Sequence, residues 1–273
     1  MDSEVMERSK KLRVISNYAV GFDNIDLNAA TERGIYVTNT PEVLTESVAD
    51  LALALMLDVA RRLNEADRFL RQGKWEGWAP MLLLGNDVYN KTLGIVGLGR
   101  IGMAVARRAK GFNMRLLYTD MVRNEKLENE LGITYVSLEE LLKQSDFISI
   151  HVPLLPSTRH MFGEKEFKLM KPTAYLINTS RGPIVDEIAL VEALRKRIIG
   201  GAGLDVFEKE PVDPDNPLLK LENTVLLPHV ASGTIETRTA MANLAVENLI
   251  SVLQGKMPPS LVNKEVTKVK PLQ

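Results

Sequence analysis

The chain has 273 residues, of which 45% are hydrophobic and 25% charged, and its formal net charge is −1. This balance argues against a nucleic-acid-binding protein, which would carry a clustered excess of lysine and arginine. No apolar run is long enough to span a membrane, and the charged start lacks the apolar stretch of a signal peptide. The absence of cysteine excludes disulfides and thiolate metal sites, and three histidines are too few for a multi-histidine metal site. We therefore expect a cytoplasmic α/β enzyme without a metal and without a nucleic-acid or membrane partner.

The chain begins with a small segment that carries strand signals. Residues 12–16 and 35–38 are predicted strands around a short helix at 27–33, and Thr40 and Pro41 end the segment. Two strands and one helix are too few for an independent sheet. About 60 further residues, at roughly 30 per βαβ unit, would be expected before this segment. The sequence is therefore expected to be short at its N-terminus.

One long helix is predicted over residues 46–72, ending near Gly73. Its apolar positions, such as Leu51, Leu55 and Val59, exceed what one buried face of a globular helix needs. We interpret the helix as a connection between domains and as a subunit contact, so that a homodimer is the expected assembly. An ordinary buried helix explains the pattern equally well.

From residue 92 onward, short apolar runs alternate with helical stretches. The runs are apolar almost throughout, as strands buried on both faces are. Predicted strands are 92–97, 114–119, 146–152, 174–178, 199–206 and 224–227, and predicted helices are 101–110, 125–130, 138–144, 164–170, 186–196 and 235–253. This alternation predicts βαβ units in a Rossmann-type, doubly wound parallel sheet.

A glycine-rich motif lies between the first of these strands and its helix. Gly97, Gly99 and Gly102 form the pattern G-x-G-x-x-G, which has meaning because a strand precedes it and a helix follows. The first glycine permits a tight turn, the second lets the backbone approach a pyrophosphate, and the third allows close helix–strand packing. The helix N-terminus attracts phosphate, and Arg100 adds positive charge. We therefore predict a dinucleotide-binding loop.

An aspartate follows the next predicted strand. A carboxylate at that place, Asp120, accepts hydrogen bonds from an adenosine ribose and repels a 2′-phosphate. This favours NAD as the cofactor, with NADH preferred. Arg123 lies close by in the sequence and keeps NADPH open as an alternative.

A nicotinamide enzyme needs a group that exchanges a proton near neutral pH, and histidine is the usual one. His151 ends a predicted strand, His160 lies in a polar segment typical of a surface or hinge, and His229 precedes small residues that leave space for a ligand. We favour His229, although the residues alone leave His151 nearly as good a candidate.

Two further positions complete a site for a 2-oxoacid. Arginine binds a carboxylate through its bidentate fork, and Arg181 follows a predicted strand at the edge where ligands bind in open α/β sheets. A carboxylate partner raises the pKa of a histidine and fixes its tautomer, and Glu208 and Glu210 follow the next strand. A surface ion pair would explain any one of these residues taken alone.

Seven segments together resemble the D-isomer-specific 2-hydroxyacid dehydrogenase family, and in particular its archaeal-type glyoxylate reductase branch. The resemblance covers residues 11–263 in the family's order. The segments are YAVGFDNID (18–26), TNTPEVLTESVADLALALML (38–57), GIVGLGRIG (94–102), HVPLLPSTRHM (151–161), LMKPTAYLINTSRGPIVDE (169–187), GAGLDVFEKEP (201–211) and LLPHVASGT (226–234).

The resemblance implies roles for individual residues. Arg181 would bind the substrate carboxylate and polarise the carbonyl, and Glu210, which precedes a proline as Glu208 does not, would pair with the acid/base His229. Backbone N–H groups of Val20 and Gly21 would contact the substrate, and Asp205 would meet the nicotinamide carboxamide. The implied cofactor-binding set is Gly97, Leu98, Gly99, Arg100, Ile101, Gly102, Asp120, Val152, Pro153, Thr158, Thr179, Ser180, Arg181, Asp205, His229, Val230 and Ala231.

The resemblance also implies the domains and the reaction. Residues 1–40 and 229–273 would form an incomplete flavodoxin-like substrate domain, and residues 41–228 the NAD-binding domain. The expected reaction reduces glyoxylate and related 2-oxoacids such as hydroxypyruvate to the D-2-hydroxyacid. A 3-phosphoglycerate dehydrogenase-like enzyme and a non-catalytic, NADH-sensing corepressor-like protein are the alternatives. Trp78 would either reach a neighbouring subunit's active site or pack in its own core.

Overall fold

The computed structural model describes residues 1–272, which form two compact units. The sheet unit comprises Val48–Ala231, and the terminal unit combines Met1–Ser47 with the residues from Ser232 onward. The boundaries predicted at residues 40 and 229 lie a few positions away from these. His229, assigned from the sequence to the substrate domain, therefore belongs to the sheet unit. The reason is that the N–H of His229 donates to the carbonyl of Asp205, which lies in the sheet unit.

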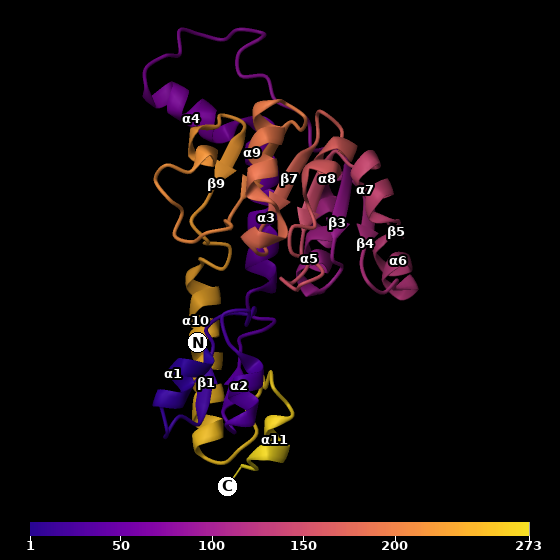
Figure 1. The fold of residues 1–273 in the computed structure, drawn as a ribbon. Coiled ribbons are helices and arrows are strands. Elements are labelled where there is room, and N and C mark those ends of the chain that lie inside the picture. Colours follow the sequence, from indigo (N-terminus) through magenta and orange to yellow (C-terminus); the bar gives the residue numbers. More distant parts are fainter. Residues whose placement is uncertain (273) are drawn as a thin grey trace. The chain divides into compact units, whose positions relative to one another are not determined.

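The sheet unit is built on seven parallel strands in the order β5-β4-β3-β6-β7-β8-β9 (Figure 1). The strands are β3 (Thr92–Val96), β4 (Arg115–Thr119), β5 (Ile133–Tyr135), β6 (Phe147–Ile150), β7 (Tyr175–Asn178), β8 (Gly201–Leu204) and β9 (Thr224–Leu226). The order reverses between β3 and β6, and ligands bind at such a switch point in doubly wound folds. The predicted Rossmann-type parallel sheet is thus confirmed. β5 was not predicted because only Ile133 of its three residues is buried, so the strand leaves no continuous apolar run.

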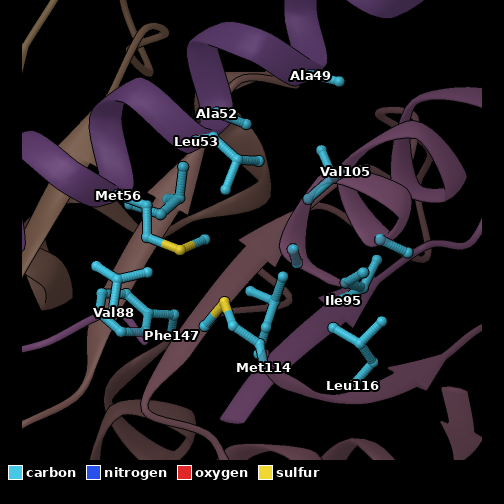
Figure 2. Packing of buried hydrophobic residues seen from close by; sticks show 14 of the residues in the cluster. Ala49, Ala52, Leu53, Met56, Val88, Ile95, Val105, Met114, Leu116 and Phe147 are labelled. Atoms are coloured by element: carbon cyan, nitrogen blue, oxygen red, sulfur yellow. The ribbon is translucent and has the colours of Figure 1, made fainter. Parts of the chain in front are cut away.

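Helices cover both faces of this sheet. They are α3 (Thr45–Arg61), α5 (Arg100–Ala109), α6 (Glu125–Leu131), α7 (Leu138–Gln144), α8 (Glu164–Leu169) and α9 (Glu187–Arg195). A further helix, α4 (Leu63–Arg71), has no buried residue. On one face, Met56 of α3 and Val105 of α5 share a buried cluster with Ile95 and Phe147 of the strands (Figure 2). A second buried cluster, with residues of α7, α8 and α9, packs on the other strand side chains. Since both faces are covered, polar chemistry is left to the strand ends.

The prediction of a single helix over residues 46–72 is wrong, because the helix is interrupted at Arg62. Arg62 has a left-handed backbone with φ of 56°, between α3 and α4. The N–H of Asn86 donates to the carbonyl of Ala60 at 2.8 Å, and that carbonyl is the one a continuous helix would bond to Asn64. The returning chain thus ends α3, which an apolar periodicity cannot reveal.

The terminal unit holds a two-stranded parallel sheet, β1 (Val14–Ser16) and β2 (Tyr36–Thr38). Its helices are α1 (Ser3–Arg8), α2 (Leu27–Glu32), α10 (Ile235–Leu253) and α11 (Val266–Val269). The hydroxyl of Ser16 donates to the carbonyl of Ala245 at 2.7 Å, so α10 lies against β1. The side chain of Asn263 accepts from Val37 N–H and donates to the carbonyl of Ile35. Chain segments from both ends of the sequence thus build one unit.

Candidate active site

The glycine motif forms a turn into which side chains would not fit. Gly97 follows β3 with φ of 95°, and a Cβ there would lie 2.8 Å from the carbonyl carbon of His151. A Cβ on Gly102 would lie 2.2 Å from the carbonyl oxygen of Gly97. A Cβ on Gly99, in contrast, would meet nothing within 4 Å in residues 1–272, and Gly99 has no side chain to cap α5. The N-terminus of α5 is therefore open to a pyrophosphate, which fits a dinucleotide.

The remaining motif residues divide between the core and the surface. Leu98 is buried, Ile101 packs against the core cluster, and Arg100 opens α5 at the exposed side. The carboxylate of Asp120 accepts from the N–H of Leu98 and from the N–H of Met121, each at 2.7 Å. Asp120 thus joins the glycine loop to the end of β4, where a ribose would lie in a dinucleotide-binding sheet.

Arg123, the residue that left NADPH as an alternative cofactor, is hydrogen-bonded to a carboxylate. Its Nε donates to Oε1 of Glu128 at 2.8 Å, and its Nη2 donates to Oε2 at 2.9 Å. The hydroxyl of Tyr118 donates to the same Oε1 at 3.0 Å and holds Glu128 in place. The bidentate pair raises the pKa of Arg123 and lowers that of Glu128. A 2′-phosphate would have to compete with Glu128 for this guanidinium.

The segment after β6 forms a closed loop. The hydroxyl of Thr158 donates to the carbonyl of Pro153 at 2.7 Å and accepts from the N–H of Leu155 at 2.8 Å. Thr158 therefore shapes the loop rather than presenting a free hydroxyl. Val152 lies beside the glycine motif, since its Cγ1 would be 2.9 Å from a Cβ on Gly97. The loop thus borders the dinucleotide-binding turn.

The turn after β7 is organised by Asn178, which the sequence analysis missed. Its side chain accepts from the N–H of Ser180 and donates to the carbonyl of Arg181, each at 3.0 Å. The hydroxyl of Ser180 donates to the carbonyl of Ile150 at 2.9 Å, which ties the turn to β6. The hydroxyl of Thr179 is buried without a hydrogen-bond partner in the described residues, so it can take one from a cofactor. The sequence does contain a signal that could have identified Asn178, because an amide side chain ends a strand that is otherwise apolar.

The structure brings Glu210 and His229 together. Nδ1 of His229 lies 2.7 Å from Oε2 of Glu210, and the other oxygen of Glu210 accepts from the N–H of Phe207 at 3.0 Å. The backbone of His229 has a φ of 53°, an uncommon conformation for a side-chain-bearing residue and one that clusters at functional sites. The pairing fixes Nδ1, so Nε2 is the ring nitrogen left for a substrate.

Asp205 holds the backbone of His229 and of the two residues that follow it. Its carboxylate is fully buried and accepts from the N–H groups of Val230 and Ala231, each at 2.8 Å. Its own carbonyl accepts from the N–H of His229 at 2.9 Å. Burial raises the pKa of Asp205, against the effect of the two N–H donors. The structure thus gives Asp205 a role in holding residues 229–231, in addition to the carboxamide contact that the resemblance implies.

The other two histidines have different partners. Nε2 of His151 lies 2.8 Å from the hydroxyl of Ser149, and burial lowers the pKa of His151 to about 4. His151 is therefore neutral near neutral pH and poorly suited to donate a proton. Nε2 of His160 lies 2.6 Å from Oε1 of Glu208. The carboxylate that does not precede the proline thus binds another histidine.

Val20 and Gly21 belong to the terminal unit, where two asparagines hold their loop. Asn39 donates to the carbonyl of Val20 at 2.8 Å, and Asn17 donates to the carbonyl of Gly21 at 2.7 Å. In a trans peptide the N–H points away from the carbonyl, so these bonds also fix the direction of the N–H groups of Gly21 and Phe22. The contact of the Val20 and Gly21 N–H groups with a substrate stays a prediction.

Residues 1–272 contain neither a cluster of metal-ligating side chains nor a helix suited to span a membrane. Among these residues, no group of three or more histidine, aspartate or glutamate side chains is placed to hold a metal ion. In the same part of the chain, none of the helices has the length and apolarity needed to cross a membrane.

Comparison with known proteins gives the family. Residues 53–231 match the family model for the NAD-binding domain of D-isomer specific 2-hydroxyacid dehydrogenases. The chain is 61% identical over 272 residues to a glyoxylate reductase of Korarchaeum cryptofilum. The aligned region covers 99% of this chain and 82% of that relative. The chain therefore belongs to the D-isomer-specific 2-hydroxyacid dehydrogenase family. It is an oxidoreductase with that family's NAD-binding domain.

Solved structures agree with this assignment. A crystal structure of a Thermus thermophilus protein matches with a TM-score of 0.91 at 51% identity, over 96% of this chain and 82% of that one. The NADPH-dependent glyoxylate/hydroxypyruvate reductase of Sinorhizobium meliloti, solved with NADP and malonate, matches with a TM-score of 0.89 at 40% identity, over 97% of this chain and 82% of that one. The same fold therefore occurs in a relative that is named for both glyoxylate and hydroxypyruvate and whose structure contains NADP.

Proposed function

We propose that this protein reduces glyoxylate and related 2-oxoacids such as hydroxypyruvate to D-2-hydroxyacids, with NADH as the hydride donor. The observation that carries the proposal is the hydrogen bond between Nδ1 of His229 and Oε2 of Glu210. A histidine oriented by a carboxylate is the group that such a reduction needs as its proton donor. The names of the relatives in Korarchaeum cryptofilum and Sinorhizobium meliloti support the substrate class.

In the proposed reaction, each residue acts on a different part of the substrate. The guanidinium of Arg181 binds the carboxylate of the 2-oxoacid and polarises the neighbouring carbonyl. Nε2 of protonated His229 donates its proton to the carbonyl oxygen, while Glu210 stabilises the charged ring through Nδ1. When bound, reduced nicotinamide supplies the hydride. Asp205 keeps residues 229–231 in place throughout.

The preference for NADH rests on two carboxylates. Asp120 lies at the end of β4, where it would accept from a ribose and repel a 2′-phosphate. Glu128 engages Arg123, the side chain that the sequence offers to bind that phosphate. NADPH remains a second cofactor in this proposal, because the relative in Sinorhizobium meliloti is NADPH-dependent.

A homodimer is the proposed assembly. Between α4 and β3 the chain forms an extended arm, residues 72–91, outside the helices and strands (Figure 1). Most of its apolar side chains are exposed, among them Trp75 at 57%, Trp78 at 84% and Met81 at 75%, whereas Val88 is buried in the core cluster. The alternative of a core-packed Trp78 is therefore wrong for the isolated chain. Clustered exposed apolar side chains mark interaction sites, and two-fold symmetry is the commonest arrangement of identical chains.

Optical recording of NADH oxidation after addition of glyoxylate tests the proposed reaction. We expect turnover by the purified chain and at least 100-fold slower turnover by His229→Gln, on the order of magnitude of lost acid–base catalysis. Fluorescence titration with NADH serves as the control, and both proteins should bind it equally. Binding of NADH without turnover of glyoxylate, hydroxypyruvate or another 2-oxoacid would instead favour the sensing protein.

A further inference from the structure

We propose that His160 is a positioning residue that fixes the two active-site segments relative to each other. It would do so through Glu208, in the loop that carries Glu210, and through Pro183, in the turn that follows Arg181. This inference rests on the proposed function, because it assigns those two segments to the reaction. His160 itself lies outside the proposed proton path, since its ring faces Glu208 and not Glu210.

The first connection of His160 is made by its backbone. Its N–H donates to the carbonyl of Pro183 at 2.9 Å, and its own φ of 51° is the left-handed conformation needed to make the turn. Immediately beyond it, Phe162 accepts from the N–H of Asp186 at 2.9 Å and donates to the carbonyl of Ile184 at 3.2 Å. Three bonds therefore join the segment around His160 to the residues that follow Arg181.

The second connection is made by the side chain. Nε2 of His160 lies 2.6 Å from Oε1 of Glu208, and the guanidinium of Arg159 lies 3.9 Å from the same oxygen. Glu208 is held on its other side, because its N–H donates to Oε2 of Glu187 at 3.0 Å. Asn216 in turn donates to Oε1 of Glu187 at 2.7 Å. The carboxylate of Glu208 is thus bound by the ring of His160, whereas the neighbouring Glu187 is held by the N–H of Glu208 and by Asn216.

Glu208 is two residues from the proposed partner of His229, in a loop with little freedom. The N–H of Phe207 donates to Oε1 of Glu210, which closes the loop on itself. A Cβ on Gly182 would lie only 1.9 Å from the carbonyl carbon of Phe207, so the turn after Arg181 packs directly on this loop. A displacement of Glu208 would therefore move Glu210, and reacting groups misplaced by about 1 Å can lose roughly 100-fold in rate.

The experiment compares four variants of the full chain: His160→Ala, His160→Gln, Glu208→Gln and, as a matched control, Arg159→Gln. His160→Ala should lower kcat for glyoxylate roughly tenfold and move the alkaline limb of the pH–rate profile to lower pH, with NADH affinity unchanged. Glu208→Gln should act in the same direction. His160→Gln should restore most of the rate, because a glutamine amide can still donate to Glu208. Arg159→Gln should stay near the wild type, since its contact is longer.

A readout independent of turnover separates this inference from the proposed function. The chain has three histidines, so each ring can be assigned in an NMR titration by its own substitution. We expect His160→Ala to shift the titration midpoint of the His229 ring in the direction that Glu210→Gln shifts it. An inactive wild type would overturn the proposed function, and this shift would still support the coupling. An unchanged His229 titration and pH–rate profile, or equal losses in His160→Ala and His160→Gln, would overturn the inference.

Discussion

Glu210 uses both of its carboxylate oxygens, one for its own loop and one for the ring of His229. Oε1 accepts from the N–H of Phe207, and Oε2 meets Nδ1 of His229. Glu210→Gln can keep one of these bonds, but it removes the negative charge that favours a protonated imidazole. We therefore expect the alkaline limb of the 2-oxoacid reduction profile to fall at lower pH. Steady-state rates between pH 5 and about 9 check this, and an unchanged profile would disprove the pairing.

His151 gives a second residue-scale prediction, on stability. Burial lowers its pKa from 6.5 to about 4, so the folded chain binds fewer protons there than the unfolded chain between these values. The free energy of unfolding should therefore fall as the pH drops from 6.5 toward 4, by at most about 3 kcal/mol. Urea unfolding at several pH values measures this fall. His151→Gln, whose amide can reach Ser149, should flatten it, and an equal slope in the variant would contradict the prediction.

Among the elements, the turn after β7 and the loop after β8 depend on one glycine. A Cβ on Gly182 would overlap the backbone of Phe207 at 1.9 Å, a distance that no side-chain adjustment relieves. Gly182→Ala should therefore force apart the segments that carry Arg181 and Glu210. We expect a loss of about 1–3 kcal/mol in stability and a larger proportional loss of kcat than of NADH affinity. Gly111→Ala is the matched control, because a Cβ there meets nothing within 4 Å in the described chain.

The connection between β4 and α6 carries the prediction on cofactor choice. Glu128 holds Arg123 with two hydrogen bonds, and Tyr118 holds Glu128. Glu128→Gln should free the guanidinium for a 2′-phosphate and improve the affinity for NADPH by roughly tenfold relative to NADH, the value of one charge-assisted contact. Competition with 2′,5′-ADP and with ADP measures the effect without turnover. An unchanged ratio, or the same change in Arg123→Gln, would show that Arg123 does not bind the phosphate.

The sequence specified the elements of the sheet well, because strands buried on both faces leave continuous apolar runs. The G-x-G-x-x-G turn could also be predicted, since its strand and helix are adjacent in the chain. The break at Arg62 could not, because its cause is a hydrogen bond from Asn86, which returns from outside the helix. Local periodicity describes contacts within an element and not those made by chain that comes back to it.

The same distinction applies to the site. Pairing of Glu210 with His229 followed from a family motif, whereas spacing alone left Glu208 as an equal candidate. What separates the two carboxylates is His160, which reaches Glu208 from a segment about fifty positions earlier in the chain. Asp205 was likewise expected at the cofactor, and its bonds to Val230 and Ala231 emerge only when β8 and the segment after β9 lie side by side.

For the whole molecule, the arm of residues 72–91 predicts association. Trp78 is 84% exposed and Met81 75% exposed, and both lie in chain that lacks regular secondary structure. Burying such side chains is worth about 1.5–3 kcal/mol each, so a second copy covering the arm would gain a large part of a dimer's affinity from them. We therefore expect a dimer at micromolar concentration.

Light scattering on the protein as it elutes from a size-exclusion column measures the mass of the assembly in solution. The double variant Trp78→Ser with Met81→Ser should weaken the dimer by at least about tenfold in dissociation constant, because it removes two apolar anchors. Met121→Ser is the matched control, since Met121 is 89% exposed but follows β4 at another place in the sheet unit. A monomeric wild type would disprove the assembly. An intact dimer in the double variant would place the interface elsewhere, and the exposed arm would then need a different partner.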